Sequence, residues 1–444
     1  MPDQTIGNRD KLGAHWMPFT TNRQFRRNSL LFSGADWMHY IREDGSRVMD
    51  AMAGLWCVNA RHNQRPIAEA IKAQADKLDF ISSFKMSHPA AFTLAQRIAD
   101  LAPEGMDHVF FTNSGSESVD TALKIAHAYH QIRGDGRRTR LVGRIRGYHG
   151  MNWGGTSVSG IGRHRSDFGP LLGEVSHMRA TMDLEHTAFS RGQPEWGAHL
   201  ADDLLTIAQT YDPSTIAAVI VEPVAGSGGV LPPPKGYLER LRAHCTKHGI
   251  LLIFDEVITG FGRLGAPFAS TYFGVMPDLI ICAKGMTNGC VPIGGVIASQ
   301  GVYDAFMEGP ESGIELMHGY TYSVHPLACA AGLATLDVYR DQGIFESAAA
   351  MAPVLEDAAH ALRDLPVLLD IRTIGILAAI DIAPRPRAPG ARGAEVAQGC
   401  LEDGVMLRTS GDTLVISPPL ILMEADIGMM FEVIGKHVKA ALRF

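Results

Sequence analysis

The sequence predicts an α/β fold in which helices cover a mostly parallel central sheet, with a smaller α+β domain towards the C-terminus. Two observations predict it. Short apolar runs without polar alternation recur through the middle of the chain, as in strands buried on both faces of a sheet. Segments with apolar residues at helical spacing lie between these runs. The composition agrees, because 46% of the 444 residues are hydrophobic and 20% are charged, as in a folded protein with a large core.

Each predicted element has a local reason. The helix predicted over 118–132 follows a strand-like run directly and carries apolar residues at helical spacing. A charged amphipathic helix is predicted over 236–248, and Gly249 is expected to end it in the left-handed conformation. The apolar runs expected to form the sheet are 108–112, 141–145, 217–223, 251–257, 278–285 and 294–299.

The two ends of the chain have a different pattern. The first 60 residues are rich in aromatic side chains and predict an irregular segment packed against the rest of the protein. After His325 the sequence predicts a smaller α+β domain, with 384–392 as an exposed loop. Its expected elements are helices near 327–340 and 352–364, strand pairs 366–372 with 376–382 and 405–409 with 413–417, and a helix over the closing residues from Glu424.

Charge and cysteine usage exclude several classes of protein. The net charge is −7, from 40 Lys and Arg against 47 Asp and Glu, so binding to nucleic acid or to an acidic membrane surface has no electrostatic support. No apolar run is long enough to span a bilayer, and the start MPDQTIGNRDKLG lacks the apolar core of a signal peptide. The six cysteines lie far apart without metal-binding spacing, which predicts a soluble, cytoplasmic protein without a metal site.

Ligands of open parallel sheets bind beyond the carboxyl ends of the strands, so functional residues are expected at those ends. Ser114-Gly115-Ser116 leads from a predicted strand into a helix, and Ser114 with Glu117 has the spacing of a capping box. Free backbone N–H groups and the helix dipole would favour an anion such as phosphate there. A well-capped helix without a ligand has the same pattern.

A carboxylate closes the run LLIFD at Asp255. Because burying a bare carboxylate is costly, Asp255 must be paired or hydrogen-bonded, either in a structural contact or with a ligand. Glu256, the next residue, is expected to point to the opposite side of the strand.

A lysine, Lys284, ends the run DLIICAK. Burial lowers the pKa of a lysine and frees a neutral amine to attack a carbonyl, whereas a lone lysine at a strand end can also extend to the surface. A phosphate cradle, a buried carboxylate and a nucleophilic lysine together are what pyridoxal 5'-phosphate (PLP) requires. Tyr148, with His149 beside it, would cover one face of the ring, and Ile258 the other.

The chain resembles the class III (omega) aminotransferases, which are fold-type I PLP enzymes. The motifs that carry the resemblance span nearly the whole chain in family order: FFTNSGSESVDTALKIA, RGYHG, VIVEPVAGSGGV, LLIFDEVITGFGR, PDLIICAKG, HGYTYSVHPLACAAG and LRTSGDTLVISPPL. HWMPFTTNRQF, GLWCVNA and HGYTYS are most similar to omega-amino acid:pyruvate (beta-alanine:pyruvate) aminotransferases. The resemblance implies a ping-pong Schiff-base transamination that yields alanine and a semialdehyde.

The resemblance also implies an architecture. Residues 61–328 would form the large PLP-binding domain and 329–444 a small α+β domain. Residues 1–60 would pack on the small domain and on the interface of a homodimer or a dimer of dimers. Lys284 would be the catalytic residue that binds PLP and moves the proton. The other implied roles are cofactor binding by Ser114, Gly115, Ser116, Tyr148, His149, Glu222, Asp255, Ile258 and, across the dimer, Thr321, and substrate binding by Phe19, Trp56, Phe84 and Arg408.

Four departures from the family pattern bear on the substrate. Relatives acting on ornithine or 4-aminobutyrate commonly carry Glu at the position of Ser227, and its absence favours pyruvate as acceptor. The turn 61–64 (RHNQ) replaces a glycine-rich turn, and Arg61 there could alter the substrate channel. Cys290 and Val324 also depart from the family pattern.

The same candidate residues are compatible with several other functions. An amine:pyruvate aminotransferase with little use for beta-alanine, or an aminomutase of the glutamate-semialdehyde type, would share the same residues. A non-catalytic PLP-fold sensor is disfavoured by the intact Lys284 and Asp255. A class I aldolase would use Lys284, but the sequence lacks the eight regular βα units of a barrel.

Overall fold

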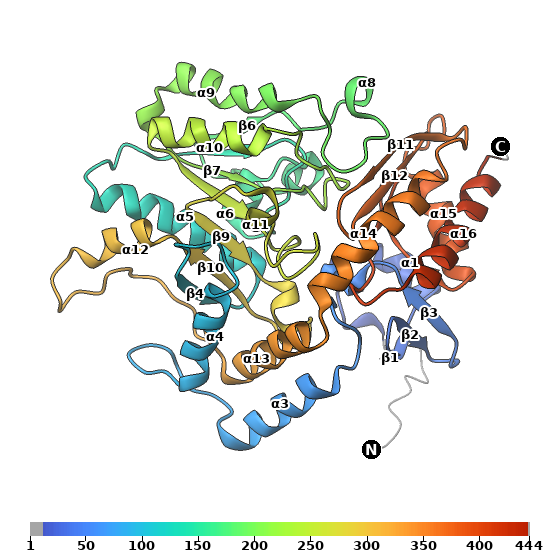
Figure 1. The fold of residues 1–444 in the computed structure, drawn as a ribbon, viewed down its shortest axis with the longest axis horizontal. Helices are drawn as coiled ribbons and strands as arrows, with labels where there is room; N and C mark the ends of the chain where they lie inside the picture. The colour runs from blue at the N-terminus through green and yellow to red at the C-terminus, as the bar shows by residue number, and fades with distance from the viewer. Residues whose placement is uncertain (1–11, 443–444) are drawn as a thin grey trace.

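The computed structural model describes residues 12–442, so the sequence-based interpretation of the first 11 residues lies outside the described part. A seven-stranded sheet forms the centre of the larger domain (Figure 1), in the order β4-β10-β9-β8-β7-β5-β6. Only β10 runs antiparallel to its neighbours, so the prediction of a mostly parallel sheet is confirmed. The strands are β4 (His108–Thr112), β5 (Arg140–Arg144), β6 (Val175–Met178), β7 (Ile216–Val221), β8 (Leu251–Asp255), β9 (Leu279–Cys282) and β10 (Gly294–Ala298).

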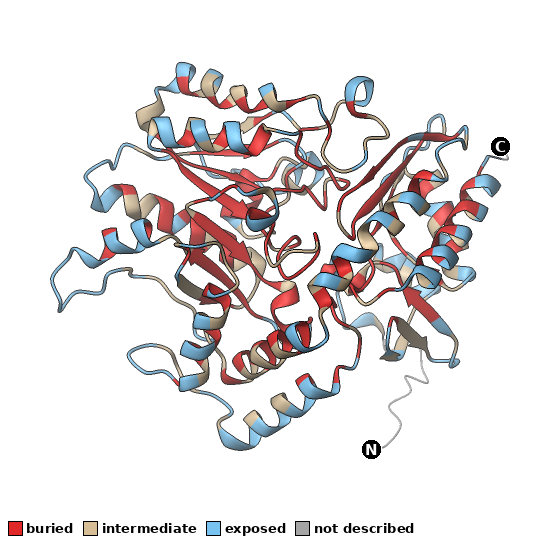
Figure 2. Cartoon of the chain, in the orientation of Figure 1, coloured by how far each residue is buried: buried red, intermediate tan, exposed pale blue. Residues whose placement is uncertain are grey.

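Alternate residues of β8 show how the sheet is covered on both faces. Leu251 and Ile253 pack with residues of α5 (Gly115–Ile132), whereas Leu252 and Phe254 pack with residues of α10 (Tyr237–His248). Figure 2 shows buried strands between helices whose outer faces are exposed. Gly249 ends α10 with a φ of 64°, as predicted. The apolar runs are therefore continuous because both faces of each strand are buried.

The C-terminal domain contains an antiparallel sheet of β11 (Leu368–Thr373), β12 (Ala378–Ile382), β15 (Thr413–Ile416) and β14 (Arg408–Ser410). Both predicted strand pairs occur, but the second is split. β13 (Val405–Met406) pairs with the N-terminal segment, and only β14 pairs with β15. The helices of this domain are α14 (Ile344–His360), α15 (Ala391–Glu402) and α16 (Glu424–Ala440). Helix α14 begins before the predicted residue 352 because Ile344 and Ala348 are buried in the core and keep the chain helical ahead of Pro353.

The prediction of an irregular N-terminal segment is wrong. β1 (Phe32–Asp36), β2 (His39–Arg42) and β3 (Arg47–Asp50) form a sheet with β13. Pairing of β3 with β13 depends on residues far away in the sequence, so the local pattern gave little signal for it. The described part of the segment contacts the C-terminal part of the chain through the pairing of β3 with β13.

Three of the remaining helices pack together on the large domain. Helix α13 (Pro326–Asp341) packs on α3 (Arg65–Lys77) and α4 (Pro89–Ala99), so the expected boundary at 328/329 falls inside a helix of the large domain. No helix within residues 12–442 meets the length and hydrophobicity needed to cross a membrane. The other helices are α1 (Asn22–Arg27), α2 (Ala53–Trp56), α6 (Trp153–Val158), α7 (Gly162–Ser166), α8 (Leu184–Thr187), α9 (Asp203–Tyr211), α11 (Ala269–Phe273), α12 (Gln300–Met307) and the 3₁₀ turns 198–202, 213–215 and 284–287.

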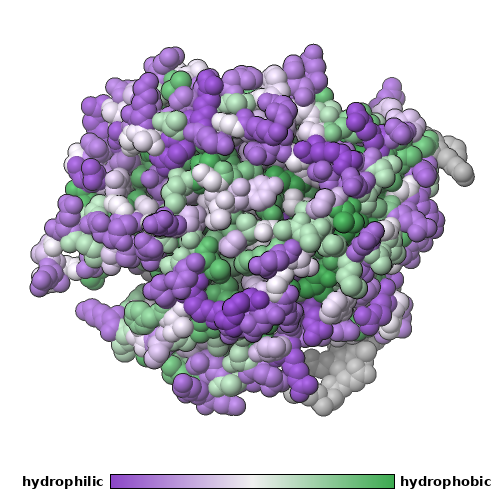
Figure 3. All heavy atoms as spheres, viewed as in Figure 1, coloured by the Kyte–Doolittle hydropathy of each residue, from purple (hydrophilic) through white to green (hydrophobic). Residues whose placement is uncertain are grey.

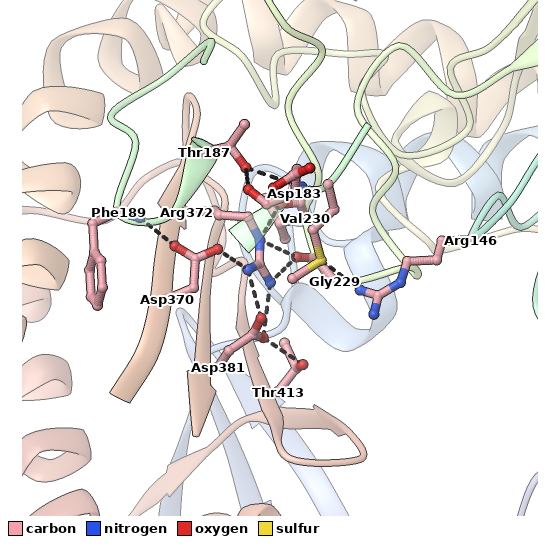
Figure 4. Close-up of polar contacts among 11 residues, drawn as sticks. Arg146, Asp183, Thr187, Phe189, Gly229, Val230, Asp370, Arg372, Asp381 and Thr413 are labelled. Atoms are coloured by element: carbon pink, nitrogen blue, oxygen red, sulfur yellow. Dashed lines mark hydrogen bonds and ion pairs between the residues drawn. The ribbon is translucent and has the colours of Figure 1, made fainter. Parts of the chain in front are cut away.

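A buried arginine joins the two domains. Arg372 of β11 forms two bonds to Asp381, of 2.7 and 3.0 Å, and pairs with Asp370 on its other side (Figure 4). It also donates to the carbonyl of Gly229, at 2.8 Å, in the loop that follows β7. Hydrophilic residues predominate on the outer helices in Figure 3, and hydrophobic ones gather towards the middle, where the domains meet. The small domain is thus fixed to the loop 225–231.

Candidate active site

A cavity of about 450 Å³ lies at the carboxyl ends of β4, β5, β7, β8 and β9. Twelve of the fourteen residues singled out from the sequence line it: Phe19, Trp56, Ser114, Gly115, Ser116, Tyr148, His149, Glu222, Asp255, Ile258, Lys284 and Arg408. Phe84 and Thr321 are not among its lining residues. The parallel strands bring these residues together, since their carboxyl ends share one edge of the sheet.

The first turn of α5 forms an anion cradle. The Ser114 hydroxyl caps the helix by accepting from the Glu117 N–H at 3.2 Å. The capping box is modified, because the Glu117 carboxylate accepts from the N–H of Asn113, at 2.7 Å, and not from that of Ser114. The N–H groups of Gly115 and Ser116 have no acceptor within residues 12–442. They are therefore available to an anion at the positive end of the helix dipole.

Gly150 lets the next strand end approach this cradle closely. Its φ is 81°, and a Cβ atom there would lie 2.9 Å from the Cα of Ser116. Any larger residue would push the loop away from α5, so a glycine is required.

Asp255 is paired within the protein. Its carboxylate lies 2.8 Å from His149 Nδ1, and both residues are buried. Since the carboxylate can only accept, the Nδ1 atom carries the proton when Asp255 is ionised. Glu256 points to the other side of the strand, as predicted, where it accepts from the N–H of Ser270 at 2.9 Å at the start of α11. The two adjacent carboxylates therefore have different roles.

Glu222 lies behind this pair. Its carboxylate accepts from the N–H groups of Tyr148, at 2.9 Å, and Gly226, at 3.0 Å. Burial raises the pKa of Glu222 to about 7, with the nearby Asp255 adding to the effect and His149 opposing it. A neutral Glu222 limits the negative charge that collects beside Asp255.

Lys284 begins the turn after β9, where its backbone has a φ of 46°. The residue lines the cavity. Burial lowers the pKa of its amine, while Cys57, Asp255 and Glu222 act in the opposite direction. The Nζ atom lies 4.9 Å from the centre of the Trp56 ring. A lysine with a lowered pKa at the cavity wall is the arrangement that nucleophilic attack on a carbonyl requires.

Arg408 of β14 lies on the wall supplied by the small domain. Its Cζ atom is 4.8 Å from the centre of the Trp56 ring, and its buried Nη1 atom has no partner among the described residues. Burial lowers the pKa of Arg408, and no carboxylate within residues 12–442 forms an ion pair with it. The guanidinium is therefore free to bind an acid that enters the cavity.

The model of the family described as aminotransferase class-III matches residues 25–438. The chain belongs to the class III aminotransferases. The aminotransferase is 56% identical over 436 residues to an omega-aminotransferase of Caulobacter vibrioides, covering 98% of this chain and 99% of that relative. It is 44% identical over 435 residues to an omega-amino acid–pyruvate aminotransferase of Pseudomonas putida, covering 97% of each chain. A solved, PLP-bound amine transaminase from an uncultivated Pseudomonas species superposes with a TM-score of 0.88 at 35% identity, covering 96% of this chain and 98% of that one.

Class III aminotransferases depend on PLP, and the cavity of this aminotransferase fits the cofactor. The free N–H groups of Gly115 and Ser116 suit the phosphate, and Lys284 suits the aldehyde. Asp255 suits the pyridine nitrogen because it presents a buried carboxylate to the same cavity. The buried His149 Nε2 atom has no hydrogen-bond partner within the described residues. Buried polar atoms are normally hydrogen-bonded, so a group bound in the cavity would be a suitable partner for it.

The two predicted residues outside the cavity lie near each other in the chain's fold. Phe84 is exposed, and its ring lies next to Gly319, 3.0 Å from where a Cβ atom of that residue would be. Gly319 is two residues before Thr321, which is also exposed. Their predicted contacts with a cofactor or substrate therefore have no counterpart within one chain of the aminotransferase.

The expectation that Arg61 alters the channel is not supported, since Arg61 lies over the Trp37 ring and does not line the cavity. Cys290 and Val324 are also absent from its lining, whereas Ser227 is present.

Sequence reasoning missed several lining residues of the aminotransferase. His164 makes edge contacts with Phe19, at 5.6 Å, and Tyr148, at 5.4 Å, between ring centres. Its position in a short helix far from any predicted strand end gave no signal. Val257 also lines the cavity. Its side chain packs closely on Gly115, since a Cβ atom added to that glycine would lie 3.0 Å from the Val257 methyl groups. Its place two residues after Asp255 is the signal that could have found it.

Proposed function

We infer that the enzyme moves the amino group of a short omega-amino acid, best represented by beta-alanine, to pyruvate. The donor leaves as a semialdehyde, and pyruvate becomes alanine in a ping-pong cycle. The relatives named omega-amino acid–pyruvate and beta-alanine–pyruvate aminotransferase support this assignment, at 44% and 45% identity over 97% and 96% of the chain.

The observation that carries the proposal is the unpaired guanidinium of Arg408. The Trp56 ring lies beside both this group and the catalytic amine, with its centre 4.8 Å from Arg408 Cζ and 4.9 Å from Lys284 Nζ. A substrate that presents its amino or carbonyl carbon to Lys284 therefore has space to place a carboxylate on Arg408. Both beta-alanine and pyruvate carry such a carboxylate, and a guanidinium binds it through two parallel bonds.

Ser227 supports the choice of acceptor. It is buried and lines the cavity without bringing a charge. A glutamate at this position would compete for Arg408 and neutralise it. With serine there, Arg408 stays available to the carboxylate in both half-reactions.

The residues of the chain have distinct tasks in this reaction. When bound, PLP supplies an electron sink that stabilises negative charge on the substrate carbon. Lys284, whose lowered pKa favours the neutral amine, would take a proton from the substrate carbon and return it to the carbon on the other side of the transferred nitrogen. Asp255 would keep a proton on the pyridine nitrogen, and His149 holds the Asp255 carboxylate in place through its Nδ1 atom. Tyr148 and Ile258 both line the cavity and would confine the ring between them.

The assembly we infer is a homodimer or a dimer of dimers, with Thr321 reaching the cofactor of the neighbouring subunit and Phe84 the neighbouring substrate site. Support comes from the exposure of both residues and from apolar side chains exposed in the same region, among them Met317 (82%) and Tyr322 (59%). A cytoplasmic location is supported by the six unpaired cysteines.

Replacing Arg408 with glutamine tests the substrate assignment. We expect kcat/KM for beta-alanine and for pyruvate to fall about 100-fold, because a charge-assisted bidentate contact is lost. The half-reaction with 1-phenylethylamine, which has no carboxylate, should change much less. Half-reaction rates with the three substrates measure this, and Arg163→Gln, on the exposed neighbouring helix α7, is the matched control. An equal loss for carboxylate and amine substrates would overturn the role of Arg408.

A further inference from the structure

The loop that carries Trp56 has a backbone that needs support. Ala53, Gly54 and Trp56 have φ angles of 50°, 69° and 59°. In this region the Cβ of an L-residue approaches the carbonyl oxygen, so Ala53 and Trp56 are held there at a cost in free energy. Such a conformation persists only where the surroundings determine it, and here it lies beside the active-site cavity.

The carboxylate of Asp50 provides that support. Asp50 ends β3 and is fully buried. One of its oxygens accepts from the N–H of Met52 at 3.1 Å, and the other accepts from the N–H of Gly54 at 2.6 Å. Both donors belong to the strained loop, so the carboxylate fixes the path of the backbone at two points.

A third donor holds Asp50 itself. His62 Nε2 lies 2.9 Å from the oxygen that also binds Gly54. The Tyr40 ring packs on the His62 ring at 4.5 Å between centres. Burial raises the pKa of Tyr40, and the nearby Asp50 adds to the effect. No lysine or arginine forms an ion pair with Asp50 within the described residues. The Asp50 carboxylate therefore contacts the backbone of the loop and the His62 ring.

The side chain of Trp56 depends on this loop for its position. The ring is buried, with 3% of its surface exposed, but its Nε1 atom has no hydrogen-bond partner in the described part of the chain. No bond of its own fixes the orientation of the indole, so backbone conformation and packing do. Lys284 Nζ and Arg408 Cζ lie 4.9 and 4.8 Å from the ring centre, so that orientation shapes the space beside the two groups.

We propose that Asp50 is a positioning residue that holds the loop 52–57 and thereby fixes Trp56 as the wall that favours small carboxylate substrates over bulky amines. This inference rests on the proposed function, because it takes Trp56 and Arg408 as parts of the substrate site. Asp50 does not line the cavity. In this proposal it governs substrate selectivity through Trp56, which does line it.

The variant Asp50→Asn tests the proposal. It keeps the size of the side chain but turns an N–H group towards one of the loop donors, and the loop is expected to relax. We expect the ratio of kcat/KM for L-alanine to kcat/KM for 1-phenylethylamine to fall about 10-fold to 100-fold, with a raised KM for pyruvate. The visible absorption of bound PLP should persist, since Lys284 is unchanged.

The control is Asp36→Asn, which removes an exposed carboxylate from β1 of the same sheet and should leave the donor ratio at the wild-type value. If Asp50→Asn does not fold, His62→Leu, which removes only one donor to Asp50, should shift the ratio in the same direction by a smaller factor. A wild-type ratio in the folded, PLP-loaded variant, or a loss of melting temperature alone, would overturn the positioning role. Absence of wild-type turnover with beta-alanine would instead contradict the proposed donor, and the ratio of the other two donors would still test Asp50.

Discussion

Replacing Lys284 with alanine is expected to lower kcat for transamination at least about 10⁴-fold, because one residue supplies both the nucleophile and the proton carrier. Lys284 is the only lysine among the described residues that line the cavity, so the variant would leave no amine with a lowered pKa among them. Cofactor binding through the α5 cradle should survive, since the free N–H groups there are unaffected.

Steady-state rates with beta-alanine and pyruvate measure this effect, and bound PLP is quantified after denaturation. Lys247→Ala, at the exposed end of α10, is the matched control and should retain full activity. Addition of a small primary amine should restore part of the activity of the Lys284 variant. Substantial turnover by Lys284→Ala without added amine would remove Lys284 from the mechanism.

Replacing Asp255 with asparagine is expected to lower kcat/KM about 10³-fold, because a preorganised negative charge is lost from a buried site. The amide oxygen can still accept from His149 Nδ1, so the fold should be retained. The charge that keeps a proton on the pyridine nitrogen would be gone, and carbanion stabilisation with it.

The adjacent carboxylate provides the control for Asp255. Glu256→Gln removes a charge one residue away, but Glu256 caps α11 on the other side of the strand. We expect this variant to lower the melting temperature and leave kcat/KM within a few-fold of wild type. If the two variants lose activity equally, the assignment of Asp255 as the cofactor's partner is wrong.

The central sheet and most of the cavity could be predicted because local signals and topology agree there. The residues at the ends of apolar runs, such as Ser114, Asp255 and Lys284, had to meet at one edge once the strands were parallel. The reversed direction of β10 and the strand β6 had no such signal. β6 is short and only partly buried, so its apolar pattern is weak.

Long-range pairing explains what could not be predicted. β3 and β13 pair although more than 350 residues separate them, and neither has a strong pattern of its own. The role of Asp50 depends on positive φ angles at Ala53 and Trp56, which no sequence pattern indicates for residues other than glycine. His164 reaches the cavity through contacts with Phe19 and Tyr148.

The visible absorption spectrum of the purified protein, recorded before and after beta-alanine and then pyruvate are added, tests whether the Lys284 cavity is a transamination site. We predict a yellow protein that bleaches with beta-alanine and recovers its colour with pyruvate, which would report both half-reactions at the Lys284 cavity. A yellow protein that beta-alanine leaves unchanged would contradict the proposed donor and favour amines without a carboxylate. A protein that stays colourless when incubated with PLP would contradict the assignment of this cavity as the cofactor site.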